Sequence, residues 1–437
     1  MDILNQLRTQ VEQVESYEIS SEVTRVGFEA GKLKSNQVEQ VSGIALRVVK
    51  DGRLGFAASS DMNAVEDLLA NVLASAAFGE KTPLTLPAAQ TALPVVAYDA
   101  TIAGLSIGSM VELGQEIVDL FLAAAPDAQV NVQLSREVQQ ISIRNQTGLD
   151  ISFQKSPFRL IYDIERVAGD DILVLYDILG STFWDQDYLQ TAKESAKKLA
   201  LAEKITTPHS GRMPVLFAPQ AGMVLALPLM VALNGKNVYT DISPLVGKLG
   251  EQLFNEQITV IDDPSLPGKW GSSPYDGEGI PSRPNVLVDA GVLKSFFYDL
   301  KTAAQMGTES TGNGSRDLFS SPQPLTTNFV ISPGETPVEQ LIAGIEHGLL
   351  VDTVIGLGQG NIYSGAFSNP VALAFKIEKG EIIGRVKEVS LAGNIYELLP
   401  QVEALSSETQ WFIDDMNETS CCLPYLLLPD VNVVAKE

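Results

Sequence analysis

Apolar residues recur at two different spacings along the first part of the chain. Over residues 2–16 they fall at helical intervals, from Ile3 to Val14, and predict a first helix. A residue suited to capping, Asp61, precedes the next helical pattern. Between these helices, extended segments separated by turn residues are predicted at 17–28, 33–41, 44–49 and 54–59. The order is therefore a helix, four strands and a helix.

The stretch from residue 106 to residue 205 repeats this order. Ser109-Met110-Val111-Glu112 resembles a capping box and opens one helix, and another helix is predicted at about 187–202. The extended segments between them are 137–144, 149–154, 158–167 and 172–178. Short turns join the strands, which favours an antiparallel sheet.

These patterns predict two domains. The first is an N-terminal α+β domain, residues 1–205, in which an α-β4-α unit occurs twice, at about 1–80 and 106–205. The second, residues 206–437, is strand-rich and is expected to be a C-terminal β-rich domain. The fold class of the whole chain is thus predicted as α+β.

One apolar segment stands out in the second domain. Residues 221–233 are almost unbroken in their hydrophobicity, a length typical of a buried core helix and too short for a membrane span. Pro228 lies in the middle of the segment and predicts a kink or a late start. We expect one buried apolar helix here.

Composition narrows the class of protein. The chain has 437 residues and a formal charge of -24, which would repel a phosphate backbone, so we expect no nucleic-acid partner. It begins without a basic and then apolar leader, and no run reaches the roughly 18 apolar residues of a spanning helix. A cytoplasmic protein with no membrane partner is predicted.

Residues suited to hydrolytic chemistry are scarce. There are two histidines: His209 lies in the predicted linker, and His347 is expected to end a helix that begins near Val338. The two cysteines, Cys421 and Cys422, are neighbours, a poor geometry for a disulfide. They are interpreted as small, partly buried residues, with a reactive or metal-binding thiol pair as the alternative.

Two glycine-rich loops invite a comparison with anion-binding motifs. The loop 356–361 follows an extended segment, but a turn and a strand are predicted after it where a dinucleotide fingerprint would open a helix. The loop 310–316 has the composition of an anion-binding nest of backbone amides, and a flexible polar connection is the alternative interpretation. Neither loop establishes nucleotide binding.

Six segments of the second half carry a family resemblance when they are taken in order. They are Gly271-Ser272-Ser273-Pro274-Tyr275-Asp276-Gly277-Glu278-Gly279, Gly291-Val292-Leu293, Ser310-Thr311-Gly312-Asn313-Gly314, Gly360-Asn361-Ile362-Tyr363-Ser364-Gly365-Ala366-Phe367-Ser368, Ile377-Glu378-Lys379-Gly380-Glu381-Ile382 and Leu391-Ala392-Gly393-Asn394. As an ordered set they resemble the TldD/PmbA family. The resemblance implies a two-subunit peptidase acting on unfolded or leader peptides.

The resemblance also implies where metal chemistry would lie. TldD-type members of the family carry an HExxxH helix and a cysteine that bind zinc. Aligned with that helix, this chain has Ala226 and Val231 at the histidine positions and Leu227 at the glutamate position. The pattern is similar to the PmbA (TldE-type) subunit, although Ala366 and Ala374 depart from the family's usual residues.

The leading hypothesis is a non-catalytic PmbA/TldE-type subunit that offers exposed strand edges to a peptide while a TldD-type partner cuts it. No cofactor is expected in this chain, and zinc is expected in the partner. Residues predicted to contact peptide or partner are Ser272, Ser273, Tyr275, Asn313, Asn361, Tyr363 and Ser364.

Two alternatives stay open at this point. One is a stand-alone hydrolase that uses Asp276 and Glu278, or a cysteine at 421 or 422. The other is a homodimeric peptide-binding or scaffold protein.

Overall fold

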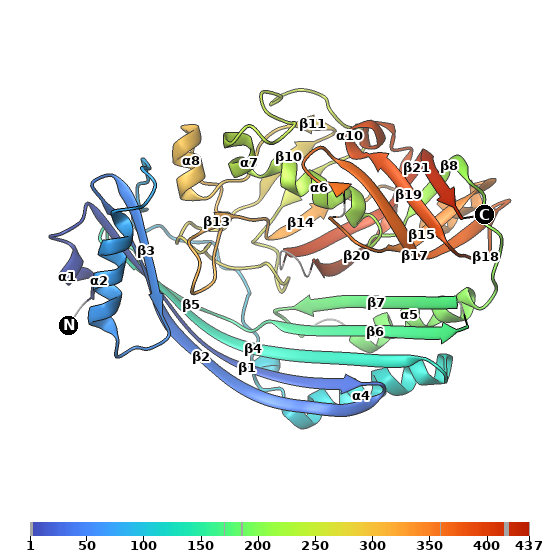
Figure 1. Cartoon of the computed structure of the whole chain (residues 1–437), viewed down its shortest axis with the longest axis horizontal. Coiled ribbons are helices and arrows are strands. Elements are labelled where there is room, and N and C mark those ends of the chain that lie inside the picture. Colours follow the sequence, from blue (N-terminus) through green and yellow to red (C-terminus); the bar gives the residue numbers. More distant parts are fainter. Residues whose placement is uncertain (1–2, 170, 185–186, 359, 415–418, 437) are drawn as a thin grey trace.

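Two sheets make up most of the molecule. The structure is a computed structural model, and it describes residues 3–169, 171–184, 187–358, 360–414 and 419–436. In Figure 1 a long, curved sheet from the first half of the chain lies beneath the strand-rich second half, and helices cover its outer side. The predicted α+β fold class is confirmed.

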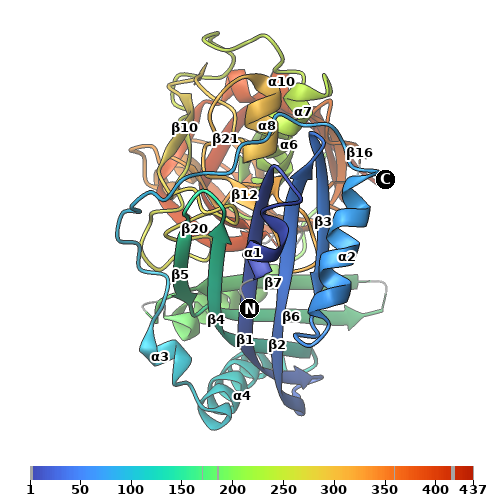
Figure 2. The same ribbon diagram turned by 90° about the vertical axis from the view of Figure 1, so that its left-hand side faces the viewer.

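The N-terminal sheet is antiparallel, with the strand order β3-β2-β1-β4-β6-β7 and with β5 paired to β4. Its strands are β1 (Gln13–Glu29), β2 (Lys32–Lys50), β3 (Arg53–Ser59), β4 (Gln129–Asn145), β5 (Asp150–Lys155), β6 (Phe158–Ala168) and β7 (Asp171–Ser181). Its helices are α1 (Ile3–Leu7), α2 (Val65–Ala76), α3 (Ala100–Ala103), α4 (Ile107–Ala124) and α5 (Tyr188–Ala202). Figure 2 shows α2 lying along β2 and β3.

Alternation along the strands divides the sheet into two faces. Val14, Val26 and Phe28 of β1 point to the convex face, where they are buried beneath helices. The contact with α4 is close: a Cβ atom at Gly114 would collide with the ring of Phe28. Residues of the other parity, such as Tyr17, point to the concave face, toward the second half of the chain.

The predicted helix over residues 2–16 is wrong for most of its length. Helix α1 ends at Leu7, and β1 begins at Gln13, so that Val14 pairs with Val48 of β2. Strand β1 has neighbours on both sides, β2 and β4, and their backbone hydrogen bonds outweigh the helical spacing of a few apolar residues. Residue 2 lies outside the described residues.

The predicted break between strands 33–41 and 44–49 is also absent, because β2 is continuous from Lys32 to Lys50. Gly43 lies within the strand and pairs with Ile19. A Cβ atom at Gly43 would collide with Leu318 and lie 2.7 Å from the carbonyl oxygen of Ser59. Gly43 therefore forms no turn but lets Leu318 and the backbone of β3 approach β2 closely. As a result, the first unit has three strands and not four.

Several element ends also differ from the predictions. Asp61 does not cap α2, which begins at Val65 without a side-chain cap. The cap of α4 is Ser106, whose hydroxyl accepts a hydrogen bond from the amide of Ser109. His347 does not end a helix, since it begins a strand.

The C-terminal half builds a second sheet of twelve strands. Its strands are β8 (Gly211–Phe217), β9 (Val260–Asp262), β10 (Asn285–Asp289), β11 (Val292–Leu293), β14 (Asn328–Ile331), β15 (His347–Val354), β16 (Gly360–Asn361), β17 (Ala366–Glu378), β18 (Glu381–Val386), β19 (Val389–Asn394), β20 (Ala404–Asp414) and β21 (Thr419–Ala435). A separate two-stranded sheet joins β12 (Gly314–Ser315) and β13 (Gln323–Pro324). The helices are α6 (Met223–Leu233), α7 (Gly235–Tyr239), α8 (Leu300–Met306), α9 (Val338–Ala343), α10 (Ile395–Leu398) and the 3-10 helix Leu399–Gln401.

Part of this sheet closes on itself. The neighbours β21, β19, β17, β15 and β8 form a ring, because β21 also pairs with β8. The loop 356–361 leads into β16 and β17 and not into a helix, as predicted, although residue 359 lies outside the described residues. None of the helices within the described ranges is long and apolar enough to cross a membrane.

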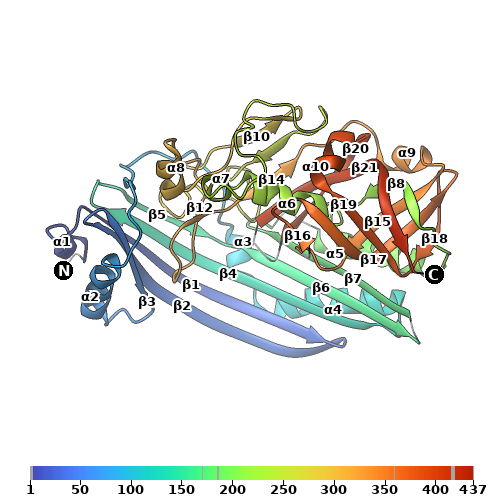
Figure 3. The ribbon, with the colours of Figure 1, turned by 45° about the horizontal axis from the view of Figure 1, so that its top comes forward.

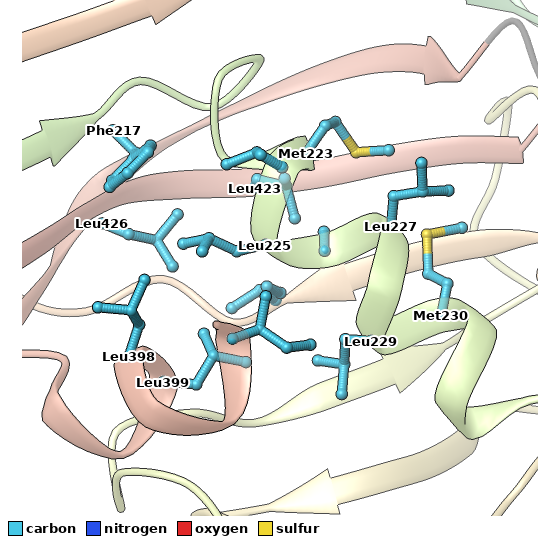
Figure 4. Packing of buried hydrophobic residues seen from close by; sticks show 14 of the residues in the cluster. Phe217, Met223, Leu225, Leu227, Leu229, Met230, Leu398, Leu399, Leu423 and Leu426 are labelled. Carbon is cyan, nitrogen blue, oxygen red and sulfur yellow. The ribbon is translucent and has the colours of Figure 1, made fainter. Parts of the chain in front are cut away.

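The predicted apolar helix is α6, and it lies in the core of the second half. All of its residues except Val231 are buried, Pro228 included. Figure 4 shows its side chains packed against Phe217 of β8, Leu426 of β21 and Leu398. A helix that is apolar on every side is expected where every side is covered.

Candidate functional site

Helix α6 carries the three positions at which the family resemblance places metal chemistry. Ala226 and Leu227 are 0% and 3% exposed, and Val231 is partly buried. None of the three side chains has a nitrogen, oxygen or sulfur atom, and Zn²⁺ needs such donors. These residues do not fit a zinc ion.

The cysteines are adjacent on β21 but do not form a reactive pair. Both thiols are buried, and burial raises the pKa of Cys421 and of Cys422 above its ordinary value. A thiol held in its protonated form is a poor nucleophile and a poor metal ligand. Within the described ranges, no three His, Cys, Asp or Glu side chains gather into a group that could hold a metal ion.

The histidines lie on the surface. His209 has its Nε2 3.4 Å from the Nζ of Lys376, in an exposed contact. The His347 side chain is 69% exposed, with Glu346 at 4.0 Å. Neither histidine lines the large cleft described next.

A cleft of about 1610 Å³ separates the concave face of the N-terminal sheet from loops of the second half. Strands β2 and β4 contribute uncharged amide side chains, namely Gln37, Gln129, Asn131, Gln133 and Gln139. The opposite wall consists of loops within 264–282 and 312–327, which contribute Trp270 and Tyr275. The cleft thus combines hydrogen-bonding amides with aromatic rings.

Three of the predicted contact residues lie on the loop that follows β9. The hydroxyl of Ser272 is buried, donates to the carbonyl of Leu266 and accepts from Asn328 at 3.0 Å, so it fixes the loop. Ser273 and Tyr275 line the cleft. The Tyr275 hydroxyl also donates to the carbonyl of Gln90, at 3.1 Å.

Asn313 is a structural residue in this fold. Its side chain is 1% exposed, and its amide donates to the carboxylate of Asp262 at 2.6 Å and to the carbonyl of Leu325 at 2.9 Å. Burial raises the pKa of Asp262 to about 6, against the hydrogen bonds from Thr327 and Asn313, which lower it. Although Asn313 is at the edge of the cleft, its side-chain amide is already engaged in the hydrogen bonds to Asp262 and Leu325.

The glycine-rich loop 310–316 contributes one backbone amide to a carboxylate of the chain itself, that of Asp276. The amide of Gly314 donates to the carboxylate of Asp276 at 2.9 Å. The amides of Glu278 and Ile280 donate to the other oxygen of Asp276, also at 2.9 Å. Asp276 therefore takes the place that an external anion would need.

The remaining three predicted residues form a separate site. Asn361, Tyr363 and Ser364 are exposed in the turn between β16 and β17 and do not line the cleft. The Ser364 hydroxyl donates to the Asn361 carbonyl at 3.0 Å. The structure therefore places Ser273, Tyr275 and Asn313 at the cleft, whereas Ser272 is buried and the other three residues lie outside the cleft.

A buried ionic cluster, which the sequence did not reveal, joins the N-terminal sheet to loops of the second half that line the cleft. Its members are Glu15 of β1, Arg47 of β2, Glu278 and Arg316, and we call it the clamp. Arg47 pairs with Glu278 and, at 3.0 Å, with Glu15; Arg316 pairs with Glu15 at 2.8 Å. All four side chains are at most 2% exposed.

Opposing electrostatic effects act on Glu278 within the clamp. Burial raises the pKa of Glu278 above its ordinary value, and the charge of Arg47 opposes that rise. The amide of Leu300 donates to the second oxygen of Glu278 at 2.6 Å. Glu278 is thus a bridge between the sheets, and with Asp276 engaged by amides the pair is not a free acid and base for hydrolysis.

The signal for the clamp was present in the sequence. Arg47 interrupts the apolar run Ile44–Val49, and Glu15 likewise comes directly after an apolar residue, Val14. A charge within a buried strand requires a charged partner. Glu15 lies 32 positions from Arg47, but the other two members are far away in the chain: Glu278 lies 231 positions from Arg47, and Arg316 lies 301 positions from Glu15.

These observations define a class of protein: it has two sheets, an α+β fold, a cleft lined partly by amide side chains, and a buried apolar helix without metal ligands. The PmbA/TldA metallopeptidase C-terminal domain matches residues 210–435, and the PmbA/TldA metallopeptidase domain 1 matches residues 14–76. The chain belongs to the PmbA/TldD metallopeptidase family.

Individual relatives agree with this assignment. The crystal structure of TldE from Thermococcus kodakarensis is similar over 99% of both chains, with a TM-score of 0.89 and 25% identity. A metalloprotease of Methanothermobacter thermautotrophicus is 27% identical over 418 residues, 93% of this chain and 90% of that protein. A metalloprotease TldD homologue of Haemophilus influenzae is 30% identical over 255 residues, 58% of this chain and 50% of that protein.

Proposed function

We propose that this chain is the non-catalytic, TldE-type subunit of a two-subunit peptidase: it holds an extended peptide, and a TldD-type subunit that carries zinc cuts the peptide. The single observation that carries the proposal is α6. At the three positions where family members hold and use zinc, this chain has Ala226, Leu227 and Val231, packed in an apolar core. A residual metal site of low affinity would need at least one donor atom there.

The cleft supports the peptide-holding part of the proposal. An amide side chain both donates and accepts hydrogen bonds, so Gln133 and Gln139 match the donors and acceptors of a peptide backbone. Trp270 and Tyr275 on the opposite wall offer apolar surface to side chains. A cleft of about 1610 Å³ is larger than the usual small-molecule site, which spans roughly 300–1,000 Å³.

The division of labour is tested by purifying this chain alone and together with a TldD-type protein. We expect stoichiometric zinc and peptide hydrolysis only in the mixture, with this chain raising the rate of cleavage. Zinc bound stoichiometrically to this chain alone would overturn the assignment of α6. Failure to associate with any TldD-type protein would remove the subunit role.

The cleft is tested by fluorescence anisotropy with a labelled unfolded peptide. The double variant Gln133→Ala/Gln139→Ala should weaken binding several-fold, because it removes two amides from the concave wall. The matched control is Gln340→Ala, an exposed glutamine on α9 outside the cleft. Equal loss of affinity in the control and the cleft variant would contradict a peptide site in the cleft.

A further inference from the structure

The floor of the cleft begins with an apolar row that crosses four strands. Ile19 of β1 pairs with Gly43 of β2 on one side and with Ile141 of β4 on the other. Ile141 pairs in turn with Phe153 of β5. Paired residues of neighbouring strands point to the same face of a sheet, and Ile19, Ile141 and Phe153 all line the cleft.

The rest of the floor, toward the hairpin between β1 and β2, is mainly polar. Ser21 of β1 pairs with Gln139 of β4, and Arg25 pairs with Ser135, and all four residues line the cleft. Val23 lies between them, but it is 7% exposed and so offers little apolar surface. The cleft therefore has an apolar end and a polar remainder.

A loop of the second half covers part of the apolar end. It comprises residues 316–322 between β12 and β13, and Figure 3 shows it descending from β12 onto the N-terminal sheet. Leu318 of this loop is buried against Gly43, which has no side chain in the way. Arg316 holds the start of the loop through its ion pair with Glu15 at 2.8 Å. The loop is thus fixed at two points.

Phe319 is exposed although the loop around it is fixed. Its amide donates to the carboxylate of Asp317 at 2.7 Å, and the amide of Asp317 donates to the hydroxyl of Ser320 at 3.1 Å. The Phe319 side chain is nevertheless 62% exposed, and it lines the cleft. Single exposed apolar residues are common on protein surfaces. This one, however, is held beside an apolar floor on the wall of a cavity.

Val41 adds to the same apolar surface. It is the next residue of β2 after Gly43 that points to the concave face, because side chains alternate along a strand. Leu318 lies on Gly43, so Phe319, the next residue of the loop, and Val41 belong to the same part of the cleft. Val41 is 43% exposed.

We propose that Ile19, Val41 and Phe319 form an anchor subsite, which takes one aromatic or large aliphatic side chain of the peptide held in the cleft. The proposal rests on the proposed peptide-holding function and adds selectivity to it. The polar remainder of the cleft holds the peptide backbone, and the anchor subsite determines which residue of the peptide lies at that end.

The two zones differ in what they can recognise. Every residue of an extended peptide has a backbone donor or acceptor, so amides such as Gln133 bind one position of the peptide as well as the next. An apolar side chain gains free energy only where it leaves water, which happens at the anchor subsite. A charged side chain placed there loses hydration and finds no polar partner among the three residues.

Two short labelled peptides test the selectivity. Both are unfolded chains of Gly, Ser and Gln, and they differ at one central position, which is Phe in one and Ser in the other. Fluorescence anisotropy with the full chain should show that the Phe peptide binds roughly tenfold more tightly, an effect typical of burying one large apolar side chain. A Leu peptide should bind almost as tightly as the Phe peptide.

Variants of the chain test the location of the subsite. Phe319→Ala should remove most of the preference for the Phe peptide, Val41→Ser should remove part of it, and Phe319→Leu should retain most of it. The double variant Gln133→Ala/Gln139→Ala should weaken both peptides by the same factor, which leaves the preference unchanged. The matched control is Phe78→Ala, at a phenylalanine that is 91% exposed and does not line the cleft.

The possible failures are distinguishable. Equal affinity of the wild type for the Phe and Ser peptides would overturn the anchor subsite and leave the peptide-holding role intact. A preference that persists in both Phe319→Ala and Val41→Ser would overturn the assignment to these residues. Binding of neither peptide would remove the peptide-holding role together with the subsite. Circular dichroism checks the fold of each variant, which is expected to be retained because Phe319 and Val41 are exposed.

Discussion

Two buried regions of this molecule deal with polar chemistry in opposite ways. Helix α6 carries the positions to which the family resemblance assigns zinc ligands, but it lies in the core and presents only apolar side chains. The clamp between the sheets is as deeply buried, yet it keeps two arginines and two glutamates. The difference lies in the partners: each charge of the clamp has an opposite charge in contact, whereas α6 is packed among apolar side chains that cannot pair with one.

The comparison predicts its largest effect for a charge placed in α6. Leu227→Glu introduces the carboxylate of the family's motif without a metal or a cation beside it, and Leu227 is 3% exposed. We expect a loss of more than about 5 kcal/mol of unfolding free energy, or no folded protein, because an unpaired buried charge is so costly. Urea unfolding measures this loss of unfolding free energy.

The control for that variant is Leu249→Glu, at a leucine that is 55% exposed. It should change the unfolding free energy by no more than about 0.5 kcal/mol. If Leu227→Glu were tolerated as well as the control, the core around α6 would contain a hidden polar partner.

The clamp should respond to the removal of one member. Glu15→Ala leaves Arg47 with one partner and takes from Arg316 its ion pair with Glu15. A loss of about 3–5 kcal/mol is expected, the usual cost of breaking a buried ion pair by removing one side. The control, Glu18→Ala on the same strand, breaks a half-exposed pair with Arg144 and should cost at most about 1 kcal/mol.

A third prediction concerns pH. Burial raises the pKa of Glu278 above the ordinary value of 4.5, so the folded protein retains a proton that the unfolded chain releases. Stability from this group is therefore present at low pH and is lost as the pH rises from about 4.5 through the raised value. Glu278→Gln removes the titration.

Between pH 5 and pH 8 the unfolding free energy of wild type should fall relative to that of this variant by about 1–3 kcal/mol, because a tenfold change in a proton-binding constant corresponds to about 1.4 kcal/mol. The loss of the charged contact with Arg47 adds a separate cost to the variant that does not change the sign of this trend. Urea unfolding at several pH values measures the difference. If the unfolding free energies of Glu278→Gln and wild type changed with pH in parallel, Glu278 would be ionised over the whole pH range.

The smallest effect is expected at the end of α6. Val231 is only partly buried, so Val231→His can turn its ring toward solvent and should cost about 1 kcal/mol. Ala226→His, at a fully buried alanine, should cost several times more because the larger ring must displace its neighbours. Thermal unfolding of the two variants compares them, and equal losses would show that α6 has one environment along its length.

The sequence predicted best those features that depend on neighbouring residues. The apolar helix was found because thirteen consecutive residues, 221–233, carry one pattern, and the strands around residues 137–178 because short turns separate them. In each case the relevant signal lies within a short window.

The features that the sequence did not predict depend on distant contacts. Gly43 looks like a turn residue until Leu318, 275 positions away, is placed against it. Glu15 and Arg316, which join across the clamp, are 301 positions apart. Asn313 looked like a binding residue because its loop is polar, and only the position of buried Asp262 shows that its amide is engaged.

The pairing of β8 with β21 has a consequence for synthesis of the chain. Gly211 pairs with Val433, so the first strand of the second half finds one of its neighbours only when a residue 222 positions further along the chain has been made. Helix α6 follows β8 directly and is covered partly by β21. During translation this apolar segment must therefore remain without its final cover for about 190 residues, which makes it the expected binding site for a chaperone on the ribosome.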